Sequence, residues 1–380
     1  VDFDDVIPRD QHHVELYAGV FARIASDEGL PAFTAGAIAE LAEHGARVAA
    51  VGERLTALLG RLADIGREAA FLARRRAAEH AGQEALVEQL DVREAVARTK
   101  RRGDGPARRF RELVRDGRVR VATEGRAVGQ INGLAVIQAG PLTYGFPTRI
   151  TASVGPGVGG TTNIEREAQL SGAIHTKGFL ILGGLLRRLL PTEHALAFDA
   201  SLAFEQSYGA IDGDSASAAE IVCLLSALTD EPITQGLAMT GAVDQLGNVL
   251  AIGAVNEKIE GFFDTCAVRG LTGEQGVIIP ASNVGDLMLR QDVVDACERG
   301  RFHVRAVSTI HEALASFFGR TAGVLDPQTG QYPPGTVLQQ AVVAAFVQWR
   351  RSLATAEDFE VVEREGPPDE GQLDGGPQGK

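Results

Sequence analysis

The sequence is poor in cysteine and has no long hydrophobic run, and each absence excludes a class of protein. Its 380 residues include three cysteines, Cys223, Cys266 and Cys297, with no CxxC spacing. An odd count without paired spacing indicates neither a disulfide framework nor a cysteine metal site, and it fits a reducing compartment. The most apolar region, 178–190, contains two arginines and is shorter than the roughly 20 residues that cross a bilayer. With no signal peptide visible, we expect a cytoplasmic protein without membrane contact.

Positive charge is also in short supply. The chain has 37 Lys and Arg against 50 Asp and Glu, a formal net charge of -13. Binding to a phosphate backbone requires a surplus of basic side chains, so we predict no nucleic-acid partner.

Metal and cofactor motifs are missing too. The eight histidines form no HExxH or other ligand spacing. Residues 155–160 satisfy GxGxxG after a strand-like run, but the acid expected about 20 residues later is absent, so we interpret them as a mobile or tight loop. We expect no metal and no cofactor in this chain.

The length of the chain predicts several domains, because 380 residues exceed the roughly 150 of a typical domain. Apolar positions recur every three or four residues over 1–102, which indicates an all-helical domain. An Arg, Gly and Pro-rich stretch then predicts a linker. Short β-rich runs beginning at Val119–Ala122, followed by alternating strands and helices, predict a mixed α/β domain, so the fold class is α+β or mixed α/β. The expected divisions are 1–102 (helical), 103–117 (linker), 118–320 (α/β), 321–364 (extension with a helix near 335–354) and 365–380 (disordered tail).

Ser215 is the candidate nucleophile. It lies in Gly213-Asp214-Ser215-Ala216-Ser217, where small residues precede a predicted helix at 216–228. Unpaired backbone N–H groups at a helix start can receive an oxyanion. The same pattern is also that of an ordinary N-cap.

A serine hydroxyl needs a base, and Lys258 is the candidate. It opens a predicted helix with apolar Ile252, Val255 and Ile259 close by. Lysine acts as a base only when partial desolvation lowers its pKa. From the residues alone, a surface lysine is the interpretation to prefer.

These motifs resemble the proteolytic domain of Lon-type ATP-dependent proteases, most closely the LonB and Lon-related branch. The resemblance rests on Gly213–Ser217, Thr240–Gly241, Leu246–Leu250 and Asn256–Ile259, and it extends over roughly 118–318. It implies a catalytic dyad of Ser215 and Lys258, 43 residues apart, with no histidine. It also implies cleavage of unfolded or damaged proteins through an acyl-enzyme.

The resemblance assigns two supporting residues. Thr240 corresponds to the threonine that hydrogen-bonds the lysine, although an ordinary strand-end threonine is the alternative. Asp214 has two open roles: a resting arrangement of the site, in which its charge would keep the lysine protonated, or capping of the helix.

The first hundred residues resemble the small helical lid of an AAA+ module, through Leu30–Phe33 and Glu43–Arg47. The sequence has no Walker A lysine or Walker B acid pair, so ATP and Mg are expected only in an upstream ATPase core. The start at Val1 favours removal of such a core from a longer chain; a protein that works without one is the alternative. The resemblance further implies a homohexamer.

Two other functions stay open. One is a noncatalytic protein-binding or assembly module that kept the fold, which an exposed, normally titrating Lys258 would favour. The other is a hydrolase that uses His175, which lies beside an apolar segment.

Overall fold

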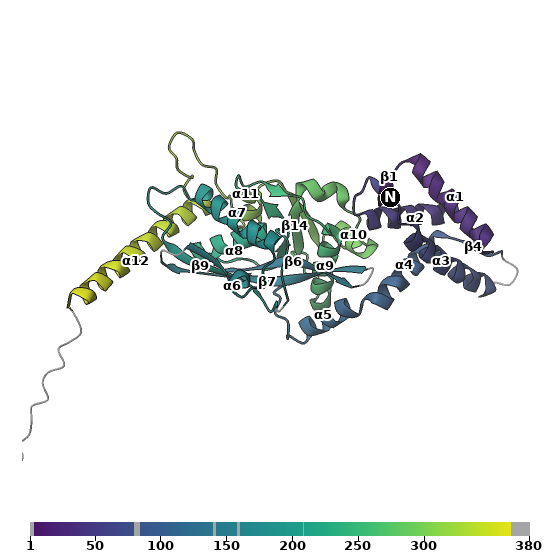
Figure 1. Ribbon diagram of the computed structural model, residues 1–380, viewed down its shortest axis with the longest axis horizontal. Helices are drawn as coiled ribbons and strands as arrows, with labels where there is room; N and C mark the ends of the chain where they lie inside the picture. Colours follow the sequence, from purple (N-terminus) through teal and green to yellow (C-terminus); the bar gives the residue numbers. More distant parts are fainter. Residues whose placement is uncertain (1–3, 80–83, 140–141, 158–159, 208, 366–380) are drawn as a thin grey trace, which may run out of the picture.

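The computed structural model describes residues 4–79, 84–139, 142–157, 160–207 and 209–365. A helical N-terminal part lies at one end, a sheet with helices on it occupies the middle, and a long C-terminal helix projects at the other end (Figure 1). The mixed fold class predicted from the sequence is confirmed.

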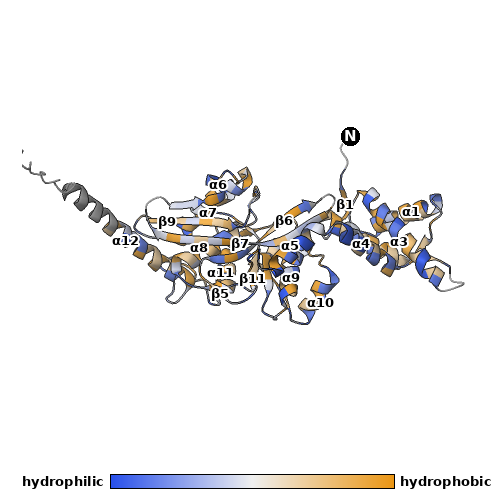
Figure 2. Cartoon of the chain, turned by 90° about the horizontal axis from the view of Figure 1, so that it is seen from below, coloured by the Kyte–Doolittle hydropathy of each residue, from blue (hydrophilic) through white to orange (hydrophobic). Residues whose placement is uncertain are grey.

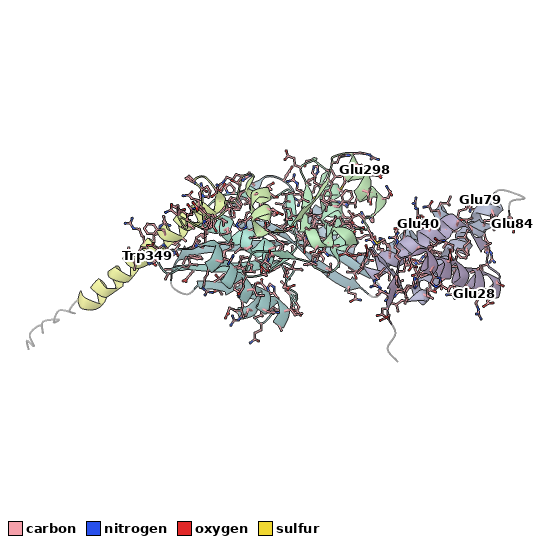
Figure 3. The ribbon with its side chains drawn as sticks, turned by 90° about the horizontal axis from the view of Figure 1, so that it is seen from above. Glu28, Glu40, Glu79, Glu84, Glu298 and Trp349 are labelled. Atoms are coloured by element: carbon pink, nitrogen blue, oxygen red, sulfur yellow. The ribbon has the colours of Figure 1, made fainter. Side chains whose placement is uncertain are left out.

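The N-terminal part is built from amphipathic helices whose apolar sides form their own core. Asp10 and Thr34 cap the first two, their side chains accepting from backbone N–H groups of the first turn. Figure 2 shows hydrophilic and hydrophobic residues mixed along each helix. Figure 3 shows Glu28, Glu40 and Glu79 on the outside of this part. The helices are α1 (Gln11–Asp27), α2 (Ala35–Ala49), α3 (Leu59–Glu79) and α4 (Gln89–Gly103). Their buried side chains include Tyr17, Phe21, Leu41, Leu62 and Val92.

The sequence predicts that this part is helical throughout, and that prediction is wrong. Two pairs of short strands connect the helix ends. With two or three residues each, these strands are too short to leave an alternating pattern in the sequence. They are β1 (Val6–Pro8) with β3 (Arg54–Thr56), and β2 (Ala32–Phe33) with β4 (Leu86–Val87).

The stretch expected to be a linker at 103–117 is mostly helix. Helix α5 spans Gly105–Arg115, with Pro106 in its first turn, where the missing N–H costs nothing. The strand predicted at Val119–Ala122 is wrong, because the structure has irregular backbone there.

A seven-stranded mixed sheet forms the centre of the second part. Its order is β15-β14-β11-β6-β7-β9-β8. Strands β15, β14, β11 and β6 run parallel, β7 is antiparallel to both neighbours, and β8 runs parallel to β9. The bounds are β6 (Gln130–Ala139), β7 (Leu142–Pro156), β8 (Gly160–Asn163), β9 (Phe198–Glu205), β11 (Leu237–Met239), β14 (Gly276–Pro280) and β15 (His303–Val307). The loop predicted at 155–160 is wrong at its ends, because Gly155 and Pro156 belong to β7 and Gly160 to β8; Val158 and Gly159 lie outside the described residues.

Helices cover both faces of this sheet. Along β11, Met239 packs into one core and Ala238 into the other, as the period of two in a strand requires. The first core holds α7 (Ala173–Leu189), α8 (Ser217–Thr229) and α11 (Ile310–Phe318). The second holds α9 (Val255–Arg269) and α10 (Gln291–Glu298). Smaller elements are α6 (Ile164–Glu167), β5 (Arg126–Ala127) with β10 (Ile233–Thr234), β12 (Ala242–Val243) with β13 (Val249–Leu250), and the 3-10 turn η1 (Ala281–Asp286).

The helix predicted near 335–354 is confirmed and is longer than expected. Helix α12 spans Val337–Glu365. Its first turns, through Ala345, are buried in the core around α8, and Trp349 lies farther out, where it stacks on His194 (Figure 3). The tail predicted from residue 365 onward lies, except for Glu365, outside the described residues. In the described part, no helix combines the length and apolar character that a membrane crossing requires.

Candidate active site

Ser215, Thr240 and Lys258 come from three separate segments and meet where β11 ends. Gly241 N donates to the Ser215 carbonyl at 2.8 Å, and Ala218 N donates to the Gly241 carbonyl at 3.0 Å. The turn that carries Ser215 is therefore fixed to the backbone just beyond the strand. The carboxyl ends of parallel strands are where α/β sheets place their reactive groups.

The amine of Lys258 lies at hydrogen-bonding distance from both hydroxyls. Its Nζ atom is 2.9 Å from Ser215 Oγ and 3.1 Å from Thr240 Oγ1. Only 3% of Lys258 is exposed, and Thr240 is fully buried. The surface-lysine interpretation is therefore wrong.

Burial also changes the acid-base chemistry of this amine. It lowers the pKa of Lys258 to about 8, because removal of water disfavours the ammonium form; the negative charge of Asp214 acts in the opposite direction. A substantial fraction of the side chain is therefore neutral near pH 8. A neutral amine carries the lone pair that can accept a serine proton.

Thr240 has its hydroxyl proton committed elsewhere. Its Oγ1 atom donates to the Ser215 carbonyl at 3.2 Å, so a lone pair of the same oxygen faces the lysine. Lys258 must donate to it. This contact holds one N–H of the lysine and orients the amine.

The turn before α8 does not have the N-cap arrangement that was the alternative interpretation of the Asp214-Ser215 pattern. The N-cap position is Ala216, with no side-chain cap bond, so neither Ser215 nor the Asp214 carboxylate caps the helix. Ser217 instead donates to the Asp214 carbonyl through its N (3.0 Å) and its Oγ (2.9 Å). Within the described ranges, the N–H groups of Asp214 and Ser215 donate no hydrogen bond. Two free donors thus flank the serine.

Asp214 is exposed, and its carboxylate makes no hydrogen bond to the described part of the chain. Its capping role is excluded by the geometry of the turn. What it contributes is a negative charge close enough to favour the protonated form of Lys258.

His175 does not join this group. It is 2% exposed, and its Nε2 atom lies 3.1 Å from Asn163 Nδ2 and 3.8 Å from Glu220 Oε1. Among the described residues, no hydrogen bond links its ring to Ser215.

The opposite side of α9 contacts the N-terminal helices. Arg47 of α2 binds the Glu260 carboxylate through two nitrogens, at 2.7 and 2.8 Å, and reaches Glu257 at 3.4 Å. The same guanidinium donates to the Met288 carbonyl at 2.8 Å. These two glutamates flank Lys258 in the sequence, so the N-terminal part contacts the helix that carries the amine.

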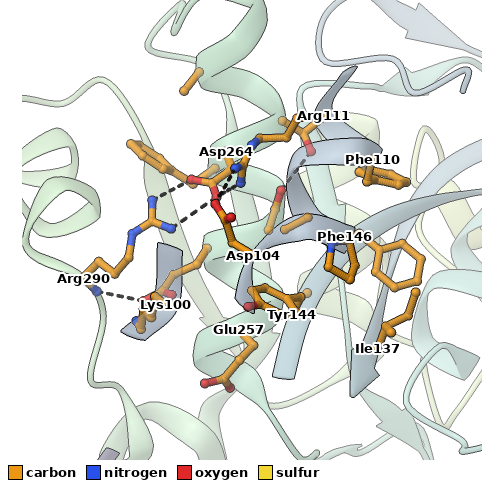
Figure 4. Close-up of a pocket in the computed structure, with 18 of the residues that line it drawn as sticks. Lys100, Asp104, Phe110, Arg111, Ile137, Tyr144, Phe146, Glu257, Asp264 and Arg290 are labelled. Atoms are coloured by element: carbon orange, nitrogen blue, oxygen red, sulfur yellow. Dashed lines mark hydrogen bonds and ion pairs between the residues drawn. The ribbon is translucent and has the colours of Figure 1, made fainter. Parts of the chain in front are cut away.

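A cavity of about 550 Å³ lies next to this contact, between α5, the β6–β7 hairpin and α9. Figure 4 shows its two sides: Phe110, Tyr144 and Phe146 on one, and Arg111 and Arg290 directed at Asp264 on the other. Arg111 and Arg290 are already paired with Asp264. In the part of the chain that the structure describes, no three His, Cys, Asp or Glu side chains gather as possible metal ligands.

Sequence reasoning missed the residues that hold the serine segment. Asp212 Oδ1 accepts from the N–H groups of Gly213, Ile174 and His175 at 2.9 to 3.2 Å. The sequence shows Asp212 directly before Gly213-Asp214-Ser215, so its position could have been noticed. Its partners are 38 and 37 residues away along the chain, and no local pattern indicates them.

The structure thus has a helical N-terminal part followed by a mixed-sheet domain that holds a serine and a buried lysine at hydrogen-bonding distance. A family model described as the Lon protease C-terminal proteolytic domain matches residues 204–319, and one described as the archaeal LonB AAA+ ATPase LID domain matches residues 32–102. This chain therefore carries two domains of the Lon protease family, a LonB-type LID and a Lon-type proteolytic domain.

Relatives agree with this assignment. A protein of Escherichia coli named as a Lon protease homolog is 47% identical over 210 residues, 55% of this chain and 36% of the relative. An archaeal Lon protease of Methanothermobacter thermautotrophicus is 30% identical over 285 residues, 75% of this chain and 41% of the relative. An archaeal Lon protease of Methanocaldococcus jannaschii is 39% identical over 201 residues, which are 50% of this chain and 28% of the relative. The chain thus spans less than half the length of these relatives.

Proposed function

We propose that this chain is a serine endopeptidase in which Lys258 activates Ser215 to cleave unfolded or damaged proteins. The observation that carries the proposal is the 2.9 Å approach of a buried amine, with a lowered pKa, to a serine hydroxyl. Among the described residues, Ser215 Oγ has no other hydrogen-bonding base. The Lon-type domain match agrees with peptidase chemistry.

Acylation follows from this arrangement. Neutral Lys258 takes the Ser215 proton while Oγ forms a bond to the peptide carbonyl carbon. The free N–H groups next to the serine stabilise the negative oxygen of the tetrahedral intermediate. Its collapse breaks the C–N bond, and the Lys258 ammonium gives its proton to the leaving amine.

Deacylation repeats these steps with water. Lys258 takes a proton from a water molecule that attacks the ester carbonyl, and the Ser215 oxygen leaves and regains a proton from the ammonium. Thr240 supports both stages, since it fixes one N–H of the lysine and leaves the lone pair directed at the serine. The nearby charge of Asp214 opposes catalysis by favouring the ammonium form.

We further propose that proteolysis is coupled to an AAA+ ATPase module and takes place in a homohexamer. The LonB-type LID supports this coupling, since a LID belongs to an AAA+ module. ATP and Mg would then be bound by that module, and mechanical unfolding would deliver the substrate.

The experiment is hydrolysis of an unstructured protein such as labelled casein by wild type, Ser215→Ala and Lys258→Ala, with folding checked by circular dichroism. An unstructured substrate needs no unfolding motor. We expect each substitution to lower kcat by about 1,000-fold or more. Lys177→Ala is the matched control, because Lys177 is exposed on α7 and should retain wild-type turnover.

Equal turnover by wild type and Ser215→Ala would remove the proposal. The remaining hypothesis would be a noncatalytic binding module, which predicts that all four proteins bind the substrate equally. Loss of turnover in His175→Ala but not in Lys258→Ala would instead favour the histidine-based hydrolase.

A further inference from the structure

Helix α9, which carries Lys258, begins without a cap from its own sequence. Its N-cap residue, Ala254, makes no side-chain cap bond and has a φ of 56° and a ψ of 39°, a left-handed conformation that residues other than glycine seldom adopt. The Lys258 N–H donates to the carbonyl of this same residue at 3.1 Å. Contacts from outside the helix must therefore hold its start, and with it the amine.

The buried side chain of Asn256 makes such a contact in the first turn of α9. Its Oδ1 atom accepts from Met288 N at 2.7 Å, and its Nδ2 atom donates to the Asp286 carbonyl at 2.8 Å. A backbone N–H can only donate and a carbonyl can only accept, so these partners fix the orientation of the amide. Both ends of the amide are bound by one short stretch of backbone, residues 286–288, which we call the anchor segment.

Asn256 and Lys258 lie on opposite sides of the helix. Residues two apart in an α-helix point about 200° away from each other. Lys258 Nζ lies 2.9 Å from Ser215 Oγ on one side, while Asn256 binds the anchor segment on the other. The first turn of α9 is thus held from the side opposite the reactive serine.

The anchor segment is itself bound to its neighbours. The Met288 carbonyl accepts from Arg47 of the LID at 2.8 Å. Just before the segment, the buried side chain of Asn283 in η1 accepts from Ile252 N at 2.9 Å and donates to the Ile252 carbonyl at 3.0 Å. A stretch of backbone fixed in this way can determine the position of a helix that attaches to it.

We propose that Asn256 is a positioning residue, which binds the first turn of α9 to the anchor segment and thereby keeps the Lys258 amine at Ser215 Oγ. The inference rests on the proposed peptidase function. It assigns to Asn256 neither proton transfer nor contact with substrate. Because Met288 binds Asn256 through its N–H and Arg47 through its carbonyl, this one residue also joins the LID to the start of α9.

The test is Asn256→Ala, which removes both hydrogen bonds and leaves Ser215 and Lys258 unchanged. Gln291→Ala is the matched control, since it also removes a side-chain amide, but one that is exposed on α10 and bonds to Asp295 of the same helix. With casein at pH 8, we expect kcat to fall about 10- to 100-fold in Asn256→Ala with KM unchanged. Gln291→Ala should match wild type.

The pH profile distinguishes a positioning role from a loss of stability. Burial lowers the pKa of Lys258 to about 8, and a displaced α9 would admit water to the amine. In Asn256→Ala, the midpoint of the kcat profile should therefore move from about pH 8 to about pH 9 or above. A protein that is merely less stable would keep the wild-type midpoint.

The two hydrogen bonds can also be tested without activity. Asn256→Asp keeps the shape of the side chain and can accept from Met288 N, but its carboxylate has no donor for the Asp286 carbonyl. Protonation restores that donor, so folding raises the pKa of this carboxyl, and the stabilisation is lost as the pH rises through that pKa. The urea midpoint of the variant should lie well below that of wild type at pH 8 and approach it at pH 5.

Four results would each overturn the inference: wild-type kcat in Asn256→Ala, a loss confined to KM, an unchanged pH midpoint, or a urea midpoint of Asn256→Asp equally far below wild type at pH 5 and pH 8. If the variants fail to fold, hydrogen exchange of the wild-type chain decides, since the Met288 N–H should be protected and rapid exchange there would contradict the proposal. If Ser215→Ala is inactive and Asn256→Ala fully active, only this inference fails; if Ser215→Ala is active, the proposed function fails.

Discussion

At the scale of single residues, the proposed mechanism depends on Lys258, whose environment sets its acid-base chemistry. An ammonium group is strongly hydrated in water, so burial beside two hydroxyls rather than a carboxylate disfavours the charge. Arginine, which stays protonated, could not replace it as a base. The neutral hydroxyl partners are therefore as much a part of the site as the lysine.

Thr240 provides a prediction at this scale. Thr240→Val keeps the shape of the side chain but removes the acceptor for Lys258 and the donor to the Ser215 carbonyl. We expect kcat for casein to fall about 10- to 100-fold, while Thr240→Ser stays near wild type because it retains the hydroxyl. Steady-state kinetics of both variants measure this. Wild-type kcat in Thr240→Val would show that the hydroxyl does not support the amine.

The residues that can be predicted from the sequence are those in short motifs. Ser215, Thr240 and Lys258 stand out through a family resemblance, whereas the residues alone favour a helix cap at Ser215 and a surface lysine at Lys258. The burial of Lys258 depends on how α9 packs on the sheet, which no local pattern encodes. His175 and Asp212 meet across 37 residues of chain, so their contact leaves no sequence signal.

Helix α9 crosses strand β7 so closely that their backbones are in contact, and this contact determines the position of Lys258. A Cβ on Gly145 would collide with the Glu257 carbonyl and lie 2.7 Å from Lys258 Cα, and a Cβ on Gly261 would collide with the Gly145 carbonyl. Two glycines facing each other let the helix lie directly on the strand. Any larger side chain there would move the helix and its amine.

Gly261→Ala tests this contact, with Gly183→Ala as the matched control. Both glycines lie inside helices, but a Cβ on Gly183 in α7 meets nothing within 4 Å. We expect Gly261→Ala to lower the free energy of unfolding by about 3 kcal/mol and Gly183→Ala to raise it by about 0.5 kcal/mol. Urea unfolding measures both. Equal stability of the two variants would contradict the close crossing.

Helices and strands can be predicted from the sequence where the apolar pattern extends over many residues, and they are missed where the element is short. Helix α8 (Ser217–Thr229) lies close to the helix predicted at 216–228, since its apolar residues continue over several turns. Helix α5 was read as a linker because arginine, glycine and proline dominate its start, and proline is compatible with a first helical turn. The short strands among the first helices pair only through tertiary contacts.

At the scale of the whole molecule, the LID is joined to the proteolytic domain through the helix that carries Lys258. The Arg47 side chain is 15% exposed and the Glu260 side chain 9%. Arg290 N also donates to Glu260 at 2.9 Å. Movement of α2 would therefore act directly on α9.

Arg47→Met should weaken this junction. Because it leaves Glu260 buried without its main cation, we expect a loss of about 3 kcal/mol in the free energy of unfolding and separate urea transitions for the two domains. Arg23→Met is the control, since the Arg23 side chain is 84% exposed and its ion pair contributes less than about 1 kcal/mol. Similar losses in both variants would show that the junction does not couple the domains.

The most direct measurement of the central claim is the rate at which a fluorophosphonate labels Ser215 as a function of pH, followed by intact mass. If the neutral form of Lys258 is the base, as proposed, the rate should be low at pH 6 and rise through one ionisation near pH 8, the pKa to which burial lowers this lysine. Above that pH the rate should level off. Lys258→Met should label at the low rate at every pH, and Ser215→Ala not at all. A wild-type rate independent of pH between 6 and 10, or a Lys258→Met protein that labels as fast as wild type, would contradict the account.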